Sequence, residues 1–115
     1  MRTIIAGSRS ITDYSLVELA VELSGILPTV IISGGARGID SLGERYAKEH
    51  NIPLEVYPAD WARYGRAAGR RRNAVMAEKA EALIALWDGE SPGTNNMIKL
   101  AEAMKLQVKV YTCEL

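Results

Sequence analysis

Thr29-Val30-Ile31-Ile32-Ser33-Gly34-Gly35-Ala36-Arg37-Gly38-Ile39-Asp40 is the stretch of sequence that decides the fold. It begins with a short run rich in β-branched side chains, which is typical of a buried strand. Three glycines within five positions then predict a tight turn, and Ile39 opens a segment in which apolar residues recur at helical spacing. A strand that passes through a glycine turn into a helix is the repeating unit of a parallel sheet covered by helices.

The same alternation recurs along the whole chain. The strands that it predicts are residues 2–6, 29–33, 53–57, 82–87 and 107–111. The helices that it predicts are residues 13–27, 39 to about 50, 68–81 and 94–105. The sequence therefore predicts an α/β fold of Rossmann-like, three-layer type, with a five-stranded, mostly parallel sheet and helices on both faces.

Two segments carry more detailed expectations. The helix at residues 13–27 is predicted to end before Pro28 and to bury one apolar stripe, formed by Leu16, Ala20, Leu23 and Leu27. Residues 58–66 are predicted to be a long loop, rich in aromatic and basic side chains, and loops of this kind often carry function.

Length and composition indicate one domain that covers residues 1–115. The chain is 48% hydrophobic, which suffices for one core, and its 14 basic and 14 acidic residues give a net charge of zero. This balance argues against a general nucleic-acid or membrane-surface binder. The apolar runs are far shorter than the roughly 20 residues of a membrane span, so we expect a cytoplasmic protein. A single cysteine, Cys113, excludes an internal disulfide, and no metal site is expected.

Glycine-bearing turns follow three of the predicted strands. They are Gly7-Ser8-Arg9, Gly34 to Gly38 with Arg37, and Gly89 to Thr94. The carboxyl ends of parallel strands meet at one edge of a sheet, where exposed backbone amides can bind phosphate. Neither the G-x-G-x-x-G pattern nor a P-loop is present, which excludes the usual dehydrogenase and ATPase motifs.

Five arginines within ten positions are the second signal. Arg70, Arg71 and Arg72 fall near the start of a predicted helix, whose dipole disfavours cations, and Arg63 and Arg66 precede them. Guanidinium groups suit phosphate recognition, so an anionic ligand is one interpretation. A solvated basic face is an equally good interpretation for Arg70 and Arg71 taken singly.

Taken together, these motifs resemble the SLOG superfamily, and most closely its YspA/cpYpsA-related branch of small phage and bacterial proteins. The segments that carry the resemblance are Gly7-Ser8-Arg9, Ile32 to Asp40, Arg72-Asn73 with Met76, and Pro92-Gly93-Thr94. The resemblance implies a domain that binds nucleotides or NAD-derived molecules, as an enzyme or as a sensor. It also implies a homodimer.

The expected function is therefore binding or sensing of a phosphate-containing nucleotide or NAD-derived ligand, with no further cofactor required. The residues expected to bind it are Gly7, Ser8, Arg9, Gly34, Gly35, Arg37, Asp40, Arg72, Asn73, Asp88, Gly93 and Thr94. Backbone amides are expected to hold phosphate, and two arginines, Arg9 and Arg72, to neutralise it. Asp40, Asn73 and Asp88 are expected to address the sugar or base, although Asp40 equally suits a simple place in a helix's first turn.

A hydrolase of nucleotide N-glycosidic bonds is the first alternative. The chain is similar to the cytokinin-activating phosphoribohydrolases, the Lonely Guy family, and Arg72 matches their catalytic arginine. Their catalytic glutamate, however, corresponds to Met97. Cleavage of such a bond usually needs a carboxylate, so the catalytic residues are unknown, with Asp40, Asp88 or Glu90 as substitutes.

Single-stranded DNA binding is the second alternative. Residues 33–40 resemble a turn of the DNA-processing protein family, and Trp61, Arg63, Tyr64 and Arg66 would supply a basic, aromatic groove. Nucleic acid is the less favoured partner because the chain as a whole is neutral.

Overall fold

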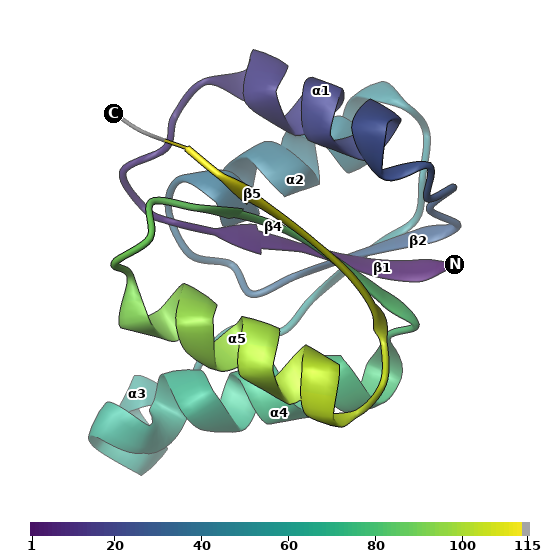
Figure 1. Cartoon of the computed structure of the whole chain (residues 1–115). Helices are drawn as coiled ribbons and strands as arrows, with labels where there is room; N and C mark the ends of the chain where they lie inside the picture. The colour runs from purple at the N-terminus through teal and green to yellow at the C-terminus, as the bar shows by residue number, and fades with distance from the viewer. Residues whose placement is uncertain (114–115) are drawn as a thin grey trace.

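The computed structural model describes residues 1–113, and its strands form one parallel sheet. The strands are β1 (Arg2–Gly7), β2 (Val30–Ser33), β3 (Leu54–Val56), β4 (Ala82–Trp87) and β5 (Gln107–Thr112). They pair in the order β3-β2-β1-β4-β5, with every neighbouring pair parallel (Figure 1). The predicted strands are confirmed to within one or two residues at most ends.

Helices cover both faces of the sheet (Figure 1). One face carries α1 (Tyr14–Ser24) and α2 (Ile39–Glu49). The other carries α4 (Ala68–Lys79) and α5 (Pro92–Ala103). The predicted Rossmann-like α/β class is therefore confirmed. None of the helices within residues 1–113 has the length and apolar character needed to cross a bilayer.

The core consists of two layers that the central strands separate. Ile5 of β1 packs towards α1 and α2, whereas its neighbour Ile4 packs towards α4 and α5, where it joins Met76 and Met97. All four side chains are at most 1% exposed. Burial on both faces explains why the central strands are continuous apolar runs rather than alternating ones.

The prediction for the first helix was wrong at its end and right for part of its buried face, because Ala20 is buried and Leu16 packs against the core. α1 ends at Ser24, because Gly25 adopts the left-handed conformation (φ 69°) and its N–H donates to the carbonyl of Glu22. Leu27 therefore lies outside the helix and is 81% exposed, and Leu23 is 64% exposed. The side chains that α1 buries are Val17, Ala20, Val21 and Ser24.

The predicted loop at residues 58–66 was also wrong in part. It contains a short helix, α3 (Trp61–Tyr64), followed by a 3-10 turn, η1 (Gly65–Ala67), which leads into α4. The side chain of Asp60 accepts a hydrogen bond from the amide of Arg63 and so caps α3. A helix of one turn is too short to show hydrophobic periodicity in the sequence.

The order of the strands creates a crevice between β1 and β4. From β1 the chain proceeds to β2 and β3 on one side, whereas from β4 it proceeds to β5 on the other. Loops that leave neighbouring strands in opposite directions open a space at the carboxyl ends of those strands, and ligands bind there in open α/β sheets. This edge lies on the left of Figure 1, opposite the N-terminus.

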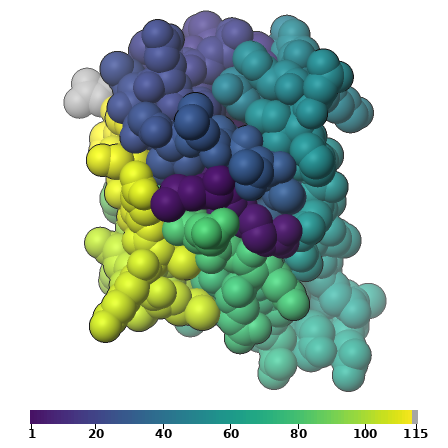
Figure 2. Space-filling model, turned by 90° about the vertical axis from the view of Figure 1, so that its right-hand side faces the viewer, coloured from purple at the N-terminus to yellow at the C-terminus, as the bar shows by residue number. Residues whose placement is uncertain are grey.

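The amino edge of the sheet is closed by backbone hydrogen bonds. The N-terminal amine donates to the carbonyl of Leu27 (2.9 Å), and the amide of Thr29 donates to the carbonyl of Met1 (2.9 Å). On the other side the amide of Glu81 donates to the carbonyl of Arg2 (2.8 Å). Figure 2 faces this edge, with the start of β1 in purple between the chain before β2 and the chain before β4.

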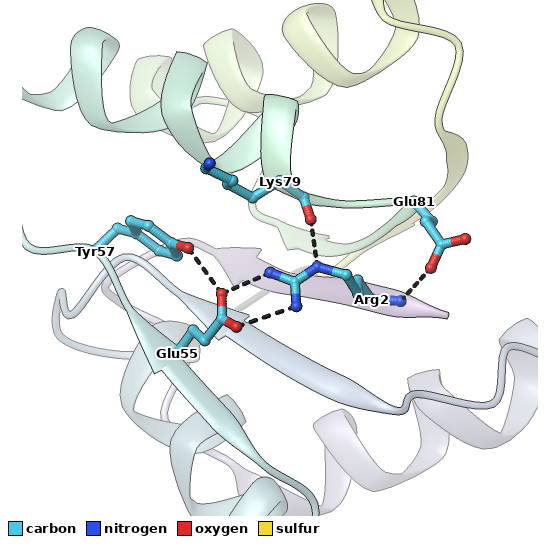
Figure 3. Close-up of polar contacts among 5 residues, drawn as sticks. All are labelled: Arg2, Glu55, Tyr57, Lys79 and Glu81. Carbon is cyan, nitrogen blue, oxygen red and sulfur yellow. Dashed lines mark hydrogen bonds and ion pairs between the residues drawn. The ribbon is translucent and has the colours of Figure 1, made fainter.

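A polar network centred on Arg2 joins β1 to β3 across β2 (Figure 3). The guanidinium of Arg2 donates to both carboxylate oxygens of Glu55 (2.6 and 3.1 Å) and to the carbonyl of Lys79 (2.7 Å). The hydroxyl of Tyr57 also donates to Glu55 (2.7 Å). The Arg2 and Glu55 side chains remain about one third exposed, so solvent screens the pair.

Glu55→Gln is expected to lower the free energy of unfolding at pH 7 and to flatten its acid dependence. Hydrogen bonds from Arg2 and then Tyr57 lower the pKa of Glu55 in the folded chain. Its stabilising contribution is therefore present above the unfolded pKa of about 4.3 and is lost as the pH falls through the lower folded value. Urea unfolding between pH 3 and pH 7 measures this. Glu78→Gln, on the exposed surface of α4, is the control, and equal pH profiles for the two variants would contradict the expectation.

Candidate ligand-binding site at the carboxyl ends of the strands

A cleft of about 660 Å³ opens at the carboxyl ends of β1 and β4. We call it the main cleft, and it lies where the strand order reverses. The residues that the sequence predicted for a site and that line it are Gly7, Ser8, Arg9, Asp40, Arg72, Asn73, Asp88, Gly93 and Thr94. They come from the ends of two strands, the first turns of α2 and α5 and the middle of α4, so the fold brings together residues that are far apart in the sequence.

A second cavity of about 370 Å³ adjoins the main cleft beside β3. We call it the side pocket. The three remaining predicted residues, Gly34, Gly35 and Arg37, line it together with Pro58 and Ala59. Four residues line both cavities: Arg9, Ala36, Trp61 and Arg72. The predicted set thus gathers around two neighbouring cavities at one edge of the sheet.

The glycines at this edge of the sheet differ in whether a side chain could be accommodated at their positions. A Cβ at Gly7 would lie 2.1 Å from the carbonyl oxygen of Leu86 and 2.8 Å from the side chain of Ile39. Close packing of β1 against β4 and α2 therefore requires Gly7. A Cβ at Gly93 would meet nothing within 4 Å, so no packing of this kind explains that glycine.

The loop after β4 is held by the carboxylate of Asp88. It accepts hydrogen bonds from the amides of Glu90 (2.9 Å) and Ser91 (2.8 Å) and from the Ser91 hydroxyl (3.0 Å). These backbone bonds lower the pKa of Asp88 to about 2. The Asp88 amide in turn donates to the hydroxyl of Ser8 (3.0 Å), which ties the ends of β1 and β4 together.

Ser91 is a residue of the site that the sequence prediction missed. Its hydroxyl lies 3.1 Å from that of Ser8 as well as close to Asp88, and Ser91 lines the main cleft. A side chain of Asp88 that bonds to the backbone two and three residues later is a known turn pattern, so the Asp-Gly-Glu-Ser sequence was the available signal.

The first turn of α5 presents backbone amides at the main cleft. The Ser91 side chain does not cap the helix, and Pro92 at the first position has no N–H. The amides of Gly93 and Thr94 have no acceptor within their own helix at these positions. Both residues line the main cleft, and the positive end of the helix dipole lies there.

Arg72 of α4 lies half-buried between the main cleft and the side pocket. It donates to the carbonyl of Gly34 and, through Nε, to the side chain of Asn73 (3.0 Å). Burial lowers the pKa of Arg72, the Asp40 carboxylate opposes this effect, and the positive charge of Arg9 adds to it. The guanidinium nevertheless stays charged at neutral pH, in a position where its charge is only partly balanced.

Asp40, in the first turn of α2, is a buried carboxylate that is only 6% exposed. It accepts a hydrogen bond from the amide of Ala36 (3.1 Å) and so holds the turn after β2. Burial raises the pKa of Asp40, while the Ala36 hydrogen bond and Arg72 lower it by smaller amounts. A Cβ at Gly34 would lie within 3 Å of both Asp40 and Arg72, which shows how closely the two side chains flank that turn.

Asn73 connects the two helices on this side of the sheet. Its amide group donates to the side chain of Asn96 (3.0 Å) and to the carbonyl of Gly93 (3.3 Å) on α5. Asn96, which also lines the main cleft, was not predicted, because a lone asparagine within a helix gives no signal in the sequence. Asn73, Asp40 and Asp88 were expected to address a sugar or base, and in this structure all three bond to the protein itself.

The arginine cluster separates into two groups. Arg66 and Arg70 line the main cleft with Arg72. Arg63 and Arg71 instead lie over the ring of Tyr64, at 5.1 and 4.3 Å from its centroid. Within residues 1–113, the lining of the two cavities contains five arginines, Arg9, Arg37, Arg66, Arg70 and Arg72, against two carboxylates, Asp40 and Asp88. Although the net charge of the chain is zero, the lining of the two cavities at the carboxyl edge of the sheet is therefore positively charged.

A parallel sheet of this order, with a basic cleft at the point where the order reverses, defines a Rossmann-like domain with a candidate ligand site at the carboxyl ends of its strands. The family model YAcAr, described as the YspA, cpYpsA-related SLOG family, matches residues 1–64, and the chain belongs to this family. The predicted resemblance is confirmed. Membership indicates a nucleotide-related function in general terms, without a specific ligand.

Two individual proteins are similar to this chain. The Gene 61 protein of Mycobacterium phage D29 is 35% identical over 118 residues, which cover 95% of this chain and 93% of that protein. A predicted subunit of tRNA methyltransferase from Methanocaldococcus jannaschii has a TM-score of 0.45 and 14% identity, and the match covers 96% of this chain and 67% of that chain.

Proposed function

We propose that the domain binds or senses a phosphate-containing nucleotide or NAD-derived ligand in the main cleft. The observation that carries this proposal is the charge of the lining. The positive charge of Arg9 helps to lower the pKa of Arg72, and Asp40, the carboxylate that opposes this effect, is buried and already bonded to Ala36. An anionic group in the cleft would relieve this repulsion and would find bidentate donors in the guanidinium groups.

The phosphate is expected at the start of α5. Gly93 and Thr94, whose amides have no acceptor within their own helix, line the cleft there, and Arg72 lines it from α4. Because a Cβ at Gly93 would point into open space, a ligand can approach this part of the backbone closely. Helix dipole, free amides and guanidinium groups then act on the same anion.

A second candidate function is hydrolysis of a nucleotide N-glycosidic bond, with Asp40 as the carboxylate. Met97, at the position of the related family's catalytic glutamate, is buried and lines the main cleft. Asp88 is a weak base because its pKa is about 2. Asp40 lines the same cleft, and burial raises its pKa, so its carboxylate is the stronger base of the two.

Thermal unfolding with and without ligand tests both candidates. AMP, NAD and ADP-ribose are each added to the purified chain, and the products are separated by chromatography. A ligand at 100 times its Kd stabilises the folded state by about 2.7 kcal/mol, so binding raises the Tm measurably. A raised Tm without released base supports binding, whereas base release that Asp40→Asn abolishes supports hydrolysis. If only single-stranded DNA raises the Tm, with a steep salt dependence, both candidates fail.

A further inference from the structure

The main cleft and the side pocket share a border that carries positive charge. Arg9 and Arg72 line both cavities, as do Ala36 and Trp61. The two volumes, about 660 and 370 Å³, each fall in the range of small-molecule sites, which is roughly 300 to 1,000 Å³. The site therefore has two lobes of unequal size with two guanidinium groups between them.

The two lobes differ in the surface that they offer. The main cleft is the larger lobe, and its volume of about 660 Å³ leaves room for a nucleoside beside the phosphate that is expected at the first turn of α5. The side pocket is bounded by the turn at Gly34 and Gly35 and by the segment Pro58-Ala59, whose side chains are small. Of the described part of the chain, only Trp61, on its border, contributes an aromatic side chain to this lining, so the pocket suits a sugar, which needs no stacking partner, better than a second base.

The aromatic residues of the α3 segment have separate roles in this arrangement. Tyr64 is covered by the guanidinium groups of Arg63 and Arg71 and lines neither cavity. Trp61 is 54% exposed and borders both lobes. Its indole is therefore the aromatic surface that a ligand can reach where the lobes meet.

We propose that the two lobes take one ligand, a nucleoside joined to a second sugar through a diphosphate. The nucleoside lies in the main cleft, the diphosphate extends from the first turn of α5 to Arg9 and Arg72, and the second sugar lies in the side pocket beside Ala59. This proposal rests on the proposed function of the main cleft. It adds that a single phosphate on a nucleoside leaves the side pocket and part of the positive charge unused.

The test compares AMP, ADP and ADP-ribose by isothermal titration calorimetry on the full chain and on two variants. Ala59→Trp fills the side pocket from a position that does not line the main cleft. Ala62→Trp, on the exposed surface of α3 and outside both linings, is the matched control. Ala59→Leu is a smaller block that serves if the tryptophan variant does not fold.

The unmodified chain is expected to bind ADP-ribose at least tenfold more tightly than ADP, and ADP more tightly than AMP. Ala59→Trp is expected to reduce the affinity for ADP-ribose to that for ADP and to leave AMP unchanged, while Ala62→Trp changes neither. Equal affinities of the unmodified chain for ADP and ADP-ribose, or retention of the preference in both Ala59 variants, would overturn the two-lobed ligand alone. If none of the three probes binds, the proposed function of the main cleft fails as well.

Discussion

Gly7→Ala is expected to destabilise the fold by about 3 kcal/mol or more, a large part of the stability of a domain of this size. The added methyl group would lie 2.1 Å from the carbonyl oxygen of Leu86, an atom of the central sheet. On its other side it would meet Ile39 at the start of α2. Because β1 pairs with β4 from Thr3 to Gly7, the strand cannot move aside without breaking that pairing.

Urea unfolding of Gly7→Ala beside Gly93→Ala measures this difference. A Cβ at Gly93 meets nothing within 4 Å, and alanine in a helix is favoured over glycine by about 0.5 to 1 kcal/mol. The control variant should therefore be as stable as the unmodified chain or slightly more stable. Equal losses at both positions would show that the packing at Gly7 is not the cause.

Arg72→Gln is expected to weaken binding of a phosphate-bearing ligand by roughly 10- to 100-fold, the usual effect of losing a hydrogen bond to a charged group. Arg72 borders both cavities, and burial already makes its charge costly when no anion is present. Arg72→Lys keeps the charge without the fork of donors. We therefore expect its affinity to lie between those of the unmodified chain and of Arg72→Gln.

Isothermal titration calorimetry with the ligand that gives the largest rise in Tm measures these affinities. Arg71→Gln is the matched control, since Arg71 is adjacent to Arg72 in the sequence but lies over Tyr64 and lines neither cavity. Arg72 also donates to the carbonyl of Gly34, so urea unfolding of each variant separates a loss of binding from a loss of fold. Unchanged affinity in a folded Arg72→Gln chain would contradict this role.

Much of the fold was predictable because its determinants are local. The apolar runs of β1, β2 and β4 and the helical spacing of α2 lie within short windows of sequence, and a buried parallel strand requires such a run. The glycine turns then indicated one edge of the sheet, since parallel strands end together. The end of α1 was missed because the early left-handed turn at Gly25 ended the helix before Pro28.

The roles of individual residues at the site were not predictable from the sequence. Gly7 and Gly93 look alike in the sequence, yet one is required by packing and the other faces open space. Neighbours such as Arg71 and Arg72 also point to different places, because residues adjacent on a helix are about 100° apart around its axis.

By itself, the sequence determined that this chain forms alternating strands and helices with glycine turns after three strands, since backbone preferences and hydrophobic spacing act over a few residues. Only the tertiary structure decided that β1 lies beside β4, that five arginines border two joined cavities, that Asn73 bonds to Asn96, and that the Asp88 amide bonds to Ser8. These contacts join residues up to 80 positions apart. No local pattern specifies them, because they depend on how whole elements pack.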